Sequence, residues 1–108
     1  MKLYIGGAYQ GQEELAGREN PGAEFFFAWH EKVRSLLEEG VDPLAYTETF
    51  CKEHPQAVVT ADEVGCGLVP MEARERAFRE AAGRALCCIA AHCDTVTRVS
   101  CGIGMRIK

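Results

Sequence analysis

The first thirteen residues predict a strand, a glycine-rich turn and a helix start in immediate succession, an order that is typical of α/β folds. Leu3-Tyr4-Ile5 is the apolar run, Gly6 and Gly11 lie in the turn, and Gln12-Glu13 open the helix. The two glycines fit the phosphate-binding loop pattern G-x-x-x-x-G-K-[ST]. Gln12, however, replaces the lysine of that pattern, and Glu13 replaces its serine or threonine.

Two interpretations of this turn remain open. In the first, backbone N–H groups of the turn and of the helix N-terminus still bind an anion, although the lysine and the Mg²⁺-binding hydroxyl are gone. In the second, the glycines only provide the positive φ angles that a tight turn needs. If a nucleotide binds, we expect it to contact Gly6, Gly7, Ala8, Tyr9, Gln10, Gly11, Gln12 and Glu13.

The two replacements weaken phosphoryl transfer in this loop. A single preorganised donor to the transition state is typically worth about 3–4 kcal/mol, and the lysine is such a donor. The carboxylate of Glu13 repels a bound phosphate unless a metal ion bridges the two. Because a helix N-terminus favours acidic side chains, we interpret Glu13 as a residue that compensates the helix dipole rather than as a substitute Mg²⁺ ligand.

The composition indicates a globular protein rather than a nucleic-acid-binding or membrane protein. Its 108 residues fit a single domain, which we place at residues 1–108. A net charge of −4, with acidic and basic residues interspersed, argues against nucleic-acid and anionic-membrane partners. The apolar runs at 25–29 and 85–91 are too short to span a bilayer, and a signal-peptide pattern is missing. We therefore expect a cytoplasmic protein.

Six cysteines raise the question of a disulfide scaffold or a metal site. Secretion is unsupported, and the sequence contains no C-x-x-C pair. A zinc site would need Cys66 and Cys101 to converge on the alanine-rich helix that precedes Cys93, with His92 as a further ligand. We instead favour reduced cysteines that pack as small apolar residues.

Hydrophobic spacing and turn residues predict alternating strands and helices. Strands are expected over 2–5, 57–61 and 95–99, and helices over 12–18, 24–39 and 71–92. A further helix starts with Asp42 as N-cap and Pro43 in the first turn, and it ends near 54–55. The residues after 104 are expected to form a short apolar tail.

Three strands that alternate with helices predict a small, mainly parallel sheet joined by right-handed crossovers. In such sheets ligands bind beyond the carboxyl ends of the strands. A glycine-bearing segment follows each predicted strand, at 6–11, 62–67 and 101–104. We therefore expect these three segments to meet at one edge of the sheet and to form a binding site there.

Several segments resemble one family of enzymes. Glu63-Val64-Gly65-Cys66-Gly67-Leu68-Val69-Pro70 resembles its N-E-V-G-x-G-x-V-P segment, and residues 6–8 resemble the start of its G-G-A-R-S-G-K-S loop. Phe78-Arg79 and Gly83-Arg84 follow its F-R-x-x-x-G-R pattern, and residues 100–108 resemble its S-G-I-G-x-x-I-K ending. This is the bifunctional adenosylcobinamide kinase/adenosylcobinamide-phosphate guanylyltransferase family of cobalamin biosynthesis, which the chain resembles over 2–13 and 57–108.

The resemblance implies a truncated P-loop NTPase-like three-layer domain that binds GTP or ATP with Mg²⁺ and also a corrinoid. It also implies a homo-oligomer, and the aromatic run at 25–29 and the exposed sheet edges favour self-association too. The chain departs from the family over 14–56, which matches poorly and is shorter. The family's guanylylated histidine has no counterpart, because neither His30 nor His54 has its local sequence context.

On this resemblance we expect a nucleotide also to contact Glu63, Gly65, Gly67 and Arg84. Asp62 and Glu63 are candidate Mg²⁺ or ribose ligands, although one of them could instead cap the turn while the other faces water. The resemblance favours the ligand role for Glu63 and leaves Asp62 open. Arg84 either contacts phosphate or pairs with an acidic residue of its own helix.

Two functions follow from these observations. In the first, the chain is a nucleotide- or corrinoid-binding member of this family whose kinase activity is weak or lost; if active, it is a transferase that moves a phosphoryl or guanylyl group. In the alternative, it is a non-catalytic structural or assembly protein that retains the fold without ligand binding. The replacements at Gln12 and Glu13 argue against kinase chemistry, whereas the segment after Glu63 favours ligand binding.

Overall fold

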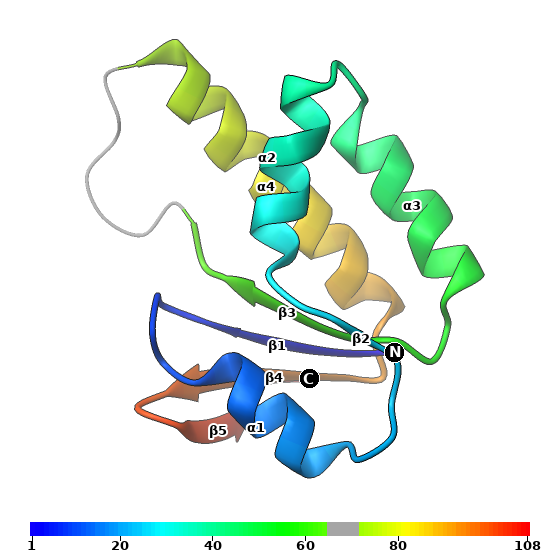
Figure 1. Cartoon of the computed structure of the whole chain (residues 1–108), viewed down its shortest axis with the longest axis vertical. Helices are drawn as coiled ribbons and strands as arrows, with labels where there is room; N and C mark the ends of the chain where they lie inside the picture. The colour runs from blue at the N-terminus through cyan, green and yellow to red at the C-terminus, as the bar shows by residue number, and fades with distance from the viewer. Residues whose placement is uncertain (65–71) are drawn as a thin grey trace.

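The computed structural model describes residues 1–64 and 72–108, which form one sheet with helices on both of its faces (Figure 1). The strands are β1 (Lys2–Gly6), β2 (Phe25–Phe26), β3 (Val58–Asp62), β4 (Thr95–Ser100) and β5 (Ile103–Arg106). The helices are α1 (Gln12–Glu19), α2 (Trp29–Glu38), α3 (Pro43–Glu53) and α4 (Ala73–His92).

Within the described residues the sheet has the strand order β2-β3-β1-β4-β5. The central strand β1 pairs in parallel with β3 and β4, β2 pairs in parallel with β3, and β5 pairs antiparallel with β4. The predicted small, mainly parallel sheet is therefore confirmed. The register sets Gly6 opposite both Asp62 and Val99, so the carboxyl ends of β1, β3 and β4 lie together.

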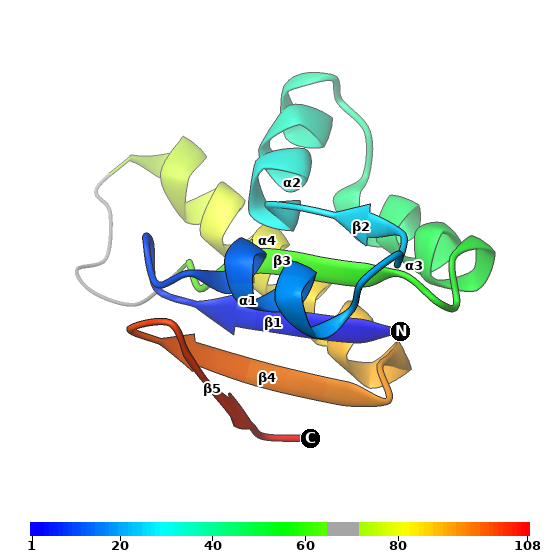
Figure 2. The same cartoon turned by 60° about the horizontal axis from the view of Figure 1, so that its bottom comes forward.

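The chain forms three layers, in which the sheet lies between α2, α3 and α4 on one face and α1 on the other (Figures 1 and 2). Successive side chains of a strand point to opposite faces, and β1 shows this alternation. Leu3 belongs to the larger core with Val59 and Ile89, whereas Tyr4 belongs to the smaller core with Leu15. Both faces are buried, as the predicted three-layer α/β architecture requires.

The helix predicted over 24–39 is wrong in its first third. Phe25 and Phe26 instead form the edge strand β2, and α2 begins only at Trp29. Ala28 separates the two elements with a left-handed φ of 56°, and its N–H donates to Thr60 Oγ1 at 3.0 Å. Aromatic residues favour strands. The edge of β3 would have no partner if Phe25 and Phe26 were helical, and as a strand they pair with it.

Most of the aromatic run packs within the molecule. Trp29 is buried and donates from its indole N–H to Thr47 Oγ1 at 3.2 Å, and the ring of Phe26 lies edge-on to that of Phe50 at 4.7 Å. Phe27 remains 48% exposed. The aromatic run therefore supports self-association less strongly than its composition indicated.

The predicted apolar tail is a fifth strand. β5 follows β4 through a turn in which Cys101 and Gly102 have φ angles of 51° and 75°. Two consecutive positive φ angles are typical of the type I′ turn that closes a tight hairpin. The sheet therefore gains an edge strand that the sequence prediction of three strands lacked.

The remaining predicted elements agree with the structure to within two residues. The N-cap of α3 is Asp42, whose Oδ1 accepts hydrogen bonds from the N–H groups of Leu44 and Ala45 at 3.0 and 3.5 Å. Gly65 and Gly67, two of the predicted ligand contacts, lie outside the described residues. Among the described helices, none combines the length and apolar character needed to cross a bilayer.

Candidate ligand cleft

A cleft of about 730 Å³ lies at the carboxyl ends of β1 and β3. We call it the β1 cleft. It is bounded by the turn after β1, the first turn of α1, the start of α2 and the β4–β5 turn. Its lining residues are Ala8, Tyr9, Gln10, Gly11, Gln12, Glu13, Glu14, Ala28, His30, Thr60, Asp62, Cys101 and Gly102. The expected edge of the sheet thus carries a cleft, and six of the eight predicted contacts in the first turn line it.

The side chain of Gln12 fills the inside of the turn. It is 5% exposed, and its Nε2 lies 3.1 Å from the carbonyl oxygen of Gly6 and 3.0 Å from that of Gly7. The same nitrogen lies 3.1 Å from Asp62 Oδ1 and 3.4 Å from the carbonyl oxygen of Ala61. An amide nitrogen has only two N–H groups, so these oxygens use both of them. Gln12 therefore ties the turn to β3 and has no donor left for a phosphate.

Packing explains one glycine of the turn, and backbone conformation explains another. A Cβ atom on Gly6 would lie 2.3 Å from the carbonyl oxygen of Val99, a distance that no side chain tolerates. Gly11 has a φ of 92° and its Cβ position lies 3.4 Å from Gly102 Cα. The interpretation that these glycines serve the backbone is therefore supported. Their presence does not by itself indicate a phosphate site.

The turn after β1 is also joined to the β4–β5 turn. The N–H of Gly102 donates to the main-chain oxygen of Gln10 at 2.8 Å, and the N–H of Cys101 donates to Gln10 Oε1 at 2.7 Å. Two of the three predicted glycine-bearing segments therefore meet at this edge. Of the third, at 62–67, the structure describes residues 62–64. Cys101 lines the cleft and is not part of the group of described residues that could hold a metal ion, and Cys66, the other cysteine of the predicted zinc site, lies outside the described residues.

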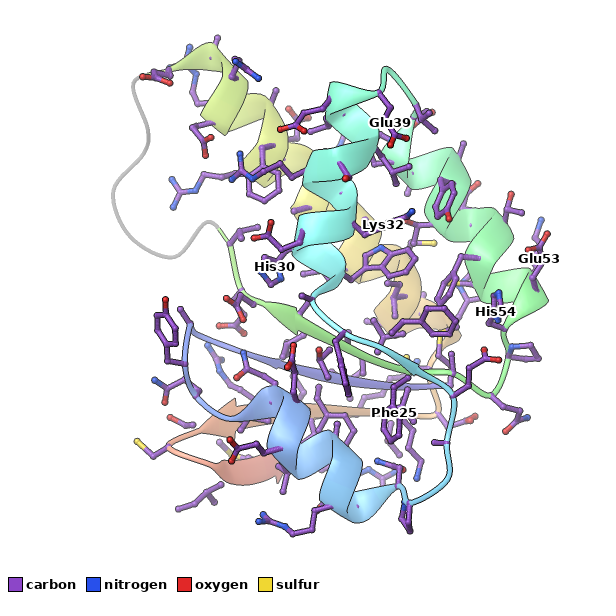
Figure 3. The ribbon with its side chains drawn as sticks, viewed as in Figure 1. Phe25, His30, Lys32, Glu39, Glu53 and His54 are labelled. Atoms are coloured by element: carbon purple, nitrogen blue, oxygen red, sulfur yellow. The ribbon has the colours of Figure 1, made fainter. Side chains whose placement is uncertain are left out.

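His30 is a cleft residue that the sequence prediction did not identify. It lies at the start of α2, above the end of β3, and its side chain is 12% exposed (Figure 3). Its Nδ1 accepts a hydrogen bond from the Asp62 N–H at 3.0 Å, and its Nε2 lies 3.6 Å from Asp62 Oδ2 and 3.5 Å from Glu31 Oε1. Because Nδ1 accepts, the proton of the neutral ring is on Nε2, which faces the carboxylates.

The described lining of the β1 cleft is acidic. It contains the carboxylates of Glu13, Glu14 and Asp62 and no lysine or arginine. Glu13 and Glu14 occupy the first turn of α1, where they compensate the helix dipole as predicted for Glu13. Three carboxylates around one cavity repel a polyphosphate. Together with the saturated amide of Gln12, this lining does not fit a nucleoside triphosphate held for transfer.

Glu63 and Arg84 are not among the described lining residues. Glu63 Oε2 lies 2.8 Å from Nη2 of Arg98 on β4, and its main-chain N–H donates to the Gly6 carbonyl oxygen at 2.7 Å. Arg84 Nη2 lies 2.6 Å from Glu80 Oε1 on α4, so the predicted alternative of pairing within its own helix is confirmed. The structure brings Asp62 to the cleft without Glu63, and their joint role as Mg²⁺ ligands stays a prediction.

Tyr9 stands at the rim of the cleft. Its side chain is fully exposed, and its backbone has a left-handed φ of 62°. A non-glycine residue in this conformation costs about 1 kcal/mol or more, and such residues cluster at binding sites. The tyrosine ring is therefore available to a ligand that enters the cleft.

A comparison with protein families gives a match to the family described as cobinamide kinase / cobinamide phosphate guanyltransferase, over residues 27–107. The matched span is three quarters of the chain, and it begins inside the middle region that resembled this family poorly. It includes the cleft residues His30, Thr60 and Asp62, whereas the turn after β1 precedes it. A comparison with curated proteins gives no match.

Proposed function

Because the chain belongs to the cobinamide kinase / cobinamide phosphate guanyltransferase family, we propose that it binds a corrinoid or a nucleotide in the β1 cleft and that its kinase activity is weak or lost. The family match supports a role in cobalamin biosynthesis. The proposal that kinase activity is weak or lost rests on Gln12, because its amide makes its hydrogen bonds inside the turn.

Kinase chemistry lacks its main electrostatic contribution here. Phosphoryl transfer depends on positive charge that neutralises the transferring phosphate. Gln12 is neutral, and the acidic side chains of Glu13 and Asp62 add negative charge at the same place. The loss of one preorganised donor alone lowers a rate by a few hundredfold, or about 3–4 kcal/mol. These residues therefore do not support phosphoryl transfer from a nucleoside triphosphate bound with Mg²⁺.

The charge of the cleft favours a corrinoid over a nucleotide. A corrinoid is a macrocycle fringed with amide groups and centred on a cationic cobalt, so carboxylates accept hydrogen bonds from it and do not repel it. The exposed ring of Tyr9 offers an apolar surface, and Thr60 and His30 add polar groups to the lining. Cavities of about 300–1,000 Å³ are usual for small-molecule sites, and this cleft falls within that range.

Calorimetric titration tests the proposal. The full chain is titrated with cobinamide, GTP and ATP, each with and without Mg²⁺. We expect saturable binding of cobinamide and at least tenfold weaker binding of both nucleotides. Asp62→Asn and Glu13→Gln remove negative charge from the cleft and should strengthen nucleotide binding relative to cobinamide. Failure of all three compounds to bind would overturn the proposal.

The second candidate is a non-catalytic structural or assembly role without a ligand. The surroundings of Gly6, Gly11 and Gln12 support it, because the fold accounts for each of these residues without a ligand. Self-association, which we also propose, would suit this role. A protein with no affinity for the three compounds but with a defined oligomeric mass would favour this candidate over the first.

A further inference from the structure

The chain contains a cluster of metal-ligating side chains away from the β1 cleft. Cys51 lies in the last turn of α3, and Cys88 and His92 lie in the last turns of α4. One ligand atom from each of the three residues lies within 4.8 Å of those of the others. We propose that Cys51, Cys88 and His92 bind Zn²⁺ and thereby join the C-terminal ends of α3 and α4.

The helices place these ligands on facing surfaces. Cys88 and His92 are four residues apart on α4, a spacing that sets both side chains on one face of a helix. The same spacing carries two zinc ligands in other helical metal sites. Cys51 supplies the third ligand from the neighbouring helix. Zn–S and Zn–N bonds of about 2.3 and 2.0–2.1 Å place sulfur atoms about 3.8 Å apart in a tetrahedral site. Side-chain movements of about 1 Å therefore close the cluster around an ion.

His92 has the support that metal-binding histidines usually have. Its Nδ1 lies 2.9 Å from the carbonyl oxygen of Cys88. In the tautomer in which Nδ1–H donates to this oxygen, the lone pair of Nε2 is available for a metal ion. Ligating histidines almost always donate their other ring N–H to a carbonyl, a carboxylate or water.

The donor set selects a thiophilic cation. Two thiolates and one imidazole suit Zn²⁺ far better than Mg²⁺ or Ca²⁺, which prefer oxygen. Cys51 is buried, Cys88 is half-buried and His92 is exposed, so an ion can enter from the surface. Burial raises the pKa of the Cys51 thiol to about 12 and also raises the pKa of the Cys88 thiol, so both thiols are protonated before binding and each releases a proton when the ion binds.

A fourth ligand is left to water or to Glu48. Glu48 is exposed and lies one turn before Cys51 on α3, and its charge acts on the thiols of both Cys51 and Cys88. The described residues within the 4.8 Å cluster supply three ligands. The fourth position is therefore open to solvent unless the Glu48 carboxylate occupies it.

The cluster lies near the amino-terminal ends of the strands, whereas the β1 cleft lies at their carboxyl ends. α3 leads into the start of β3, and α4 leads into the start of β4, so both helices end where these strands begin. Figure 3 shows Glu53 and His54 at this end of α3, away from His30 in the cleft. The proposed ion therefore stabilises the helical layer and does not take part in the chemistry of the cleft.

Cobalt substitution tests the site with a spectroscopic readout. The full chain, reduced and freed of metal with a chelator, is titrated with Co²⁺ and then with Zn²⁺. We expect one equivalent of Co²⁺ to give thiolate-to-cobalt charge transfer and the intense visible bands of tetrahedral coordination, and Zn²⁺ to remove both. Zn²⁺ should also raise the midpoint of thermal unfolding.

Matched variants locate the ion. Cys88→Ser and His92→Ala should each lose the tetrahedral spectrum, whereas Cys87→Ser and Cys101→Ser, which change exposed thiols, should retain it. Circular dichroism checks that the variants fold, and because Cys88 and His92 are not fully buried, both should do so. The proposal is overturned if the reduced wild-type chain gives no tetrahedral spectrum, or if folded Cys88→Ser and His92→Ala retain it.

Discussion

The amide of Gln12 donates to Asp62 Oδ1 at 3.1 Å and so joins the turn after β1 to the end of β3. In the phosphate-binding loop pattern this position is a lysine whose charge contacts the phosphate. Here the side chain is buried and its donors are used within the protein. The chain therefore has a neutral structural link at the position where that pattern has a cation.

Gln12→Ala should destabilise the fold. The substitution leaves the carbonyl oxygens of Gly6 and Ala61 without this donor in a buried place. Each such hydrogen bond contributes about 0.5–1.5 kcal/mol to stability, a loss that urea unfolding would measure, and the Gly6 oxygen keeps the N–H of Glu63 as a partner. Glu13→Gln, an exposed neighbour, is the control and should lose only its compensation of the helix dipole, about 0.3–1 kcal/mol. Equal stability of Gln12→Ala and wild type would contradict the structural role of Gln12.

Gly6→Ala should be far more damaging than Gly7→Ala. The new Cβ atom would lie 2.3 Å from the Val99 carbonyl oxygen at position 6, whereas at position 7 its nearest neighbour is the Gln10 side chain at 3.7 Å. Overpacking typically costs about 1–3 kcal/mol, and a clash with a backbone atom that cannot move aside should lie at the upper end of that range. Thermal unfolding of both variants compares them directly. If Gly6→Ala unfolds at the wild-type temperature, β1 and β4 do not approach as described.

Tyr9→Ala should weaken the binding of cobinamide and leave stability unchanged. The ring is fully exposed, so its removal takes nothing from the core. Aromatic contacts with a ligand are worth about 0.5–1.5 kcal/mol, which corresponds to roughly 2–10-fold in affinity. Calorimetric titration measures the affinity. An unchanged dissociation constant would show that the ligand does not reach the rim of the β1 cleft.

Self-association should depend on β5. This edge strand exposes Ile103 and Met105, which are 72% and 61% exposed, and unpaired edge strands are prone to pair with another chain. We expect sedimentation to give a mass above that of one chain and Ile103→Lys/Met105→Lys to lower it. Val41→Lys, a change at an exposed apolar residue of the α2–α3 turn, should leave the mass unchanged. A monomeric wild-type protein would contradict this prediction.

The sequence predicted the elements whose signals are local. Asp42 and Pro43 marked the start of α3, and the apolar runs of β1, β3 and β4 marked strands that are buried on both faces. The α/β fold with a mainly parallel sheet followed from their alternation with helices. These predictions depend on residues close in the chain, and the structure confirms them.

The features that the sequence did not reveal depend on distant partners. Phe25 and Phe26 form a strand only because β3 offers a free edge, and Cys101 adopts the positive φ that asparagine or glycine usually signals in a hairpin turn. His30 reaches Asp62 through the fold alone, since the two residues are 32 positions apart. Cys51 and Cys88 are likewise brought together only by the fold, and their separation in the sequence matches no metal-binding motif.

The most direct test of the account is an assay for ATP-dependent phosphorylation of cobinamide by the purified full chain, with Mg²⁺ present. The account predicts that mass spectrometry finds cobinamide phosphate at or only slightly above the enzyme-free background, because the amide of Gln12 is bound within the turn and carries no charge. Multiple turnovers to cobinamide phosphate would contradict it, since they would require a cation that the described cleft does not contain.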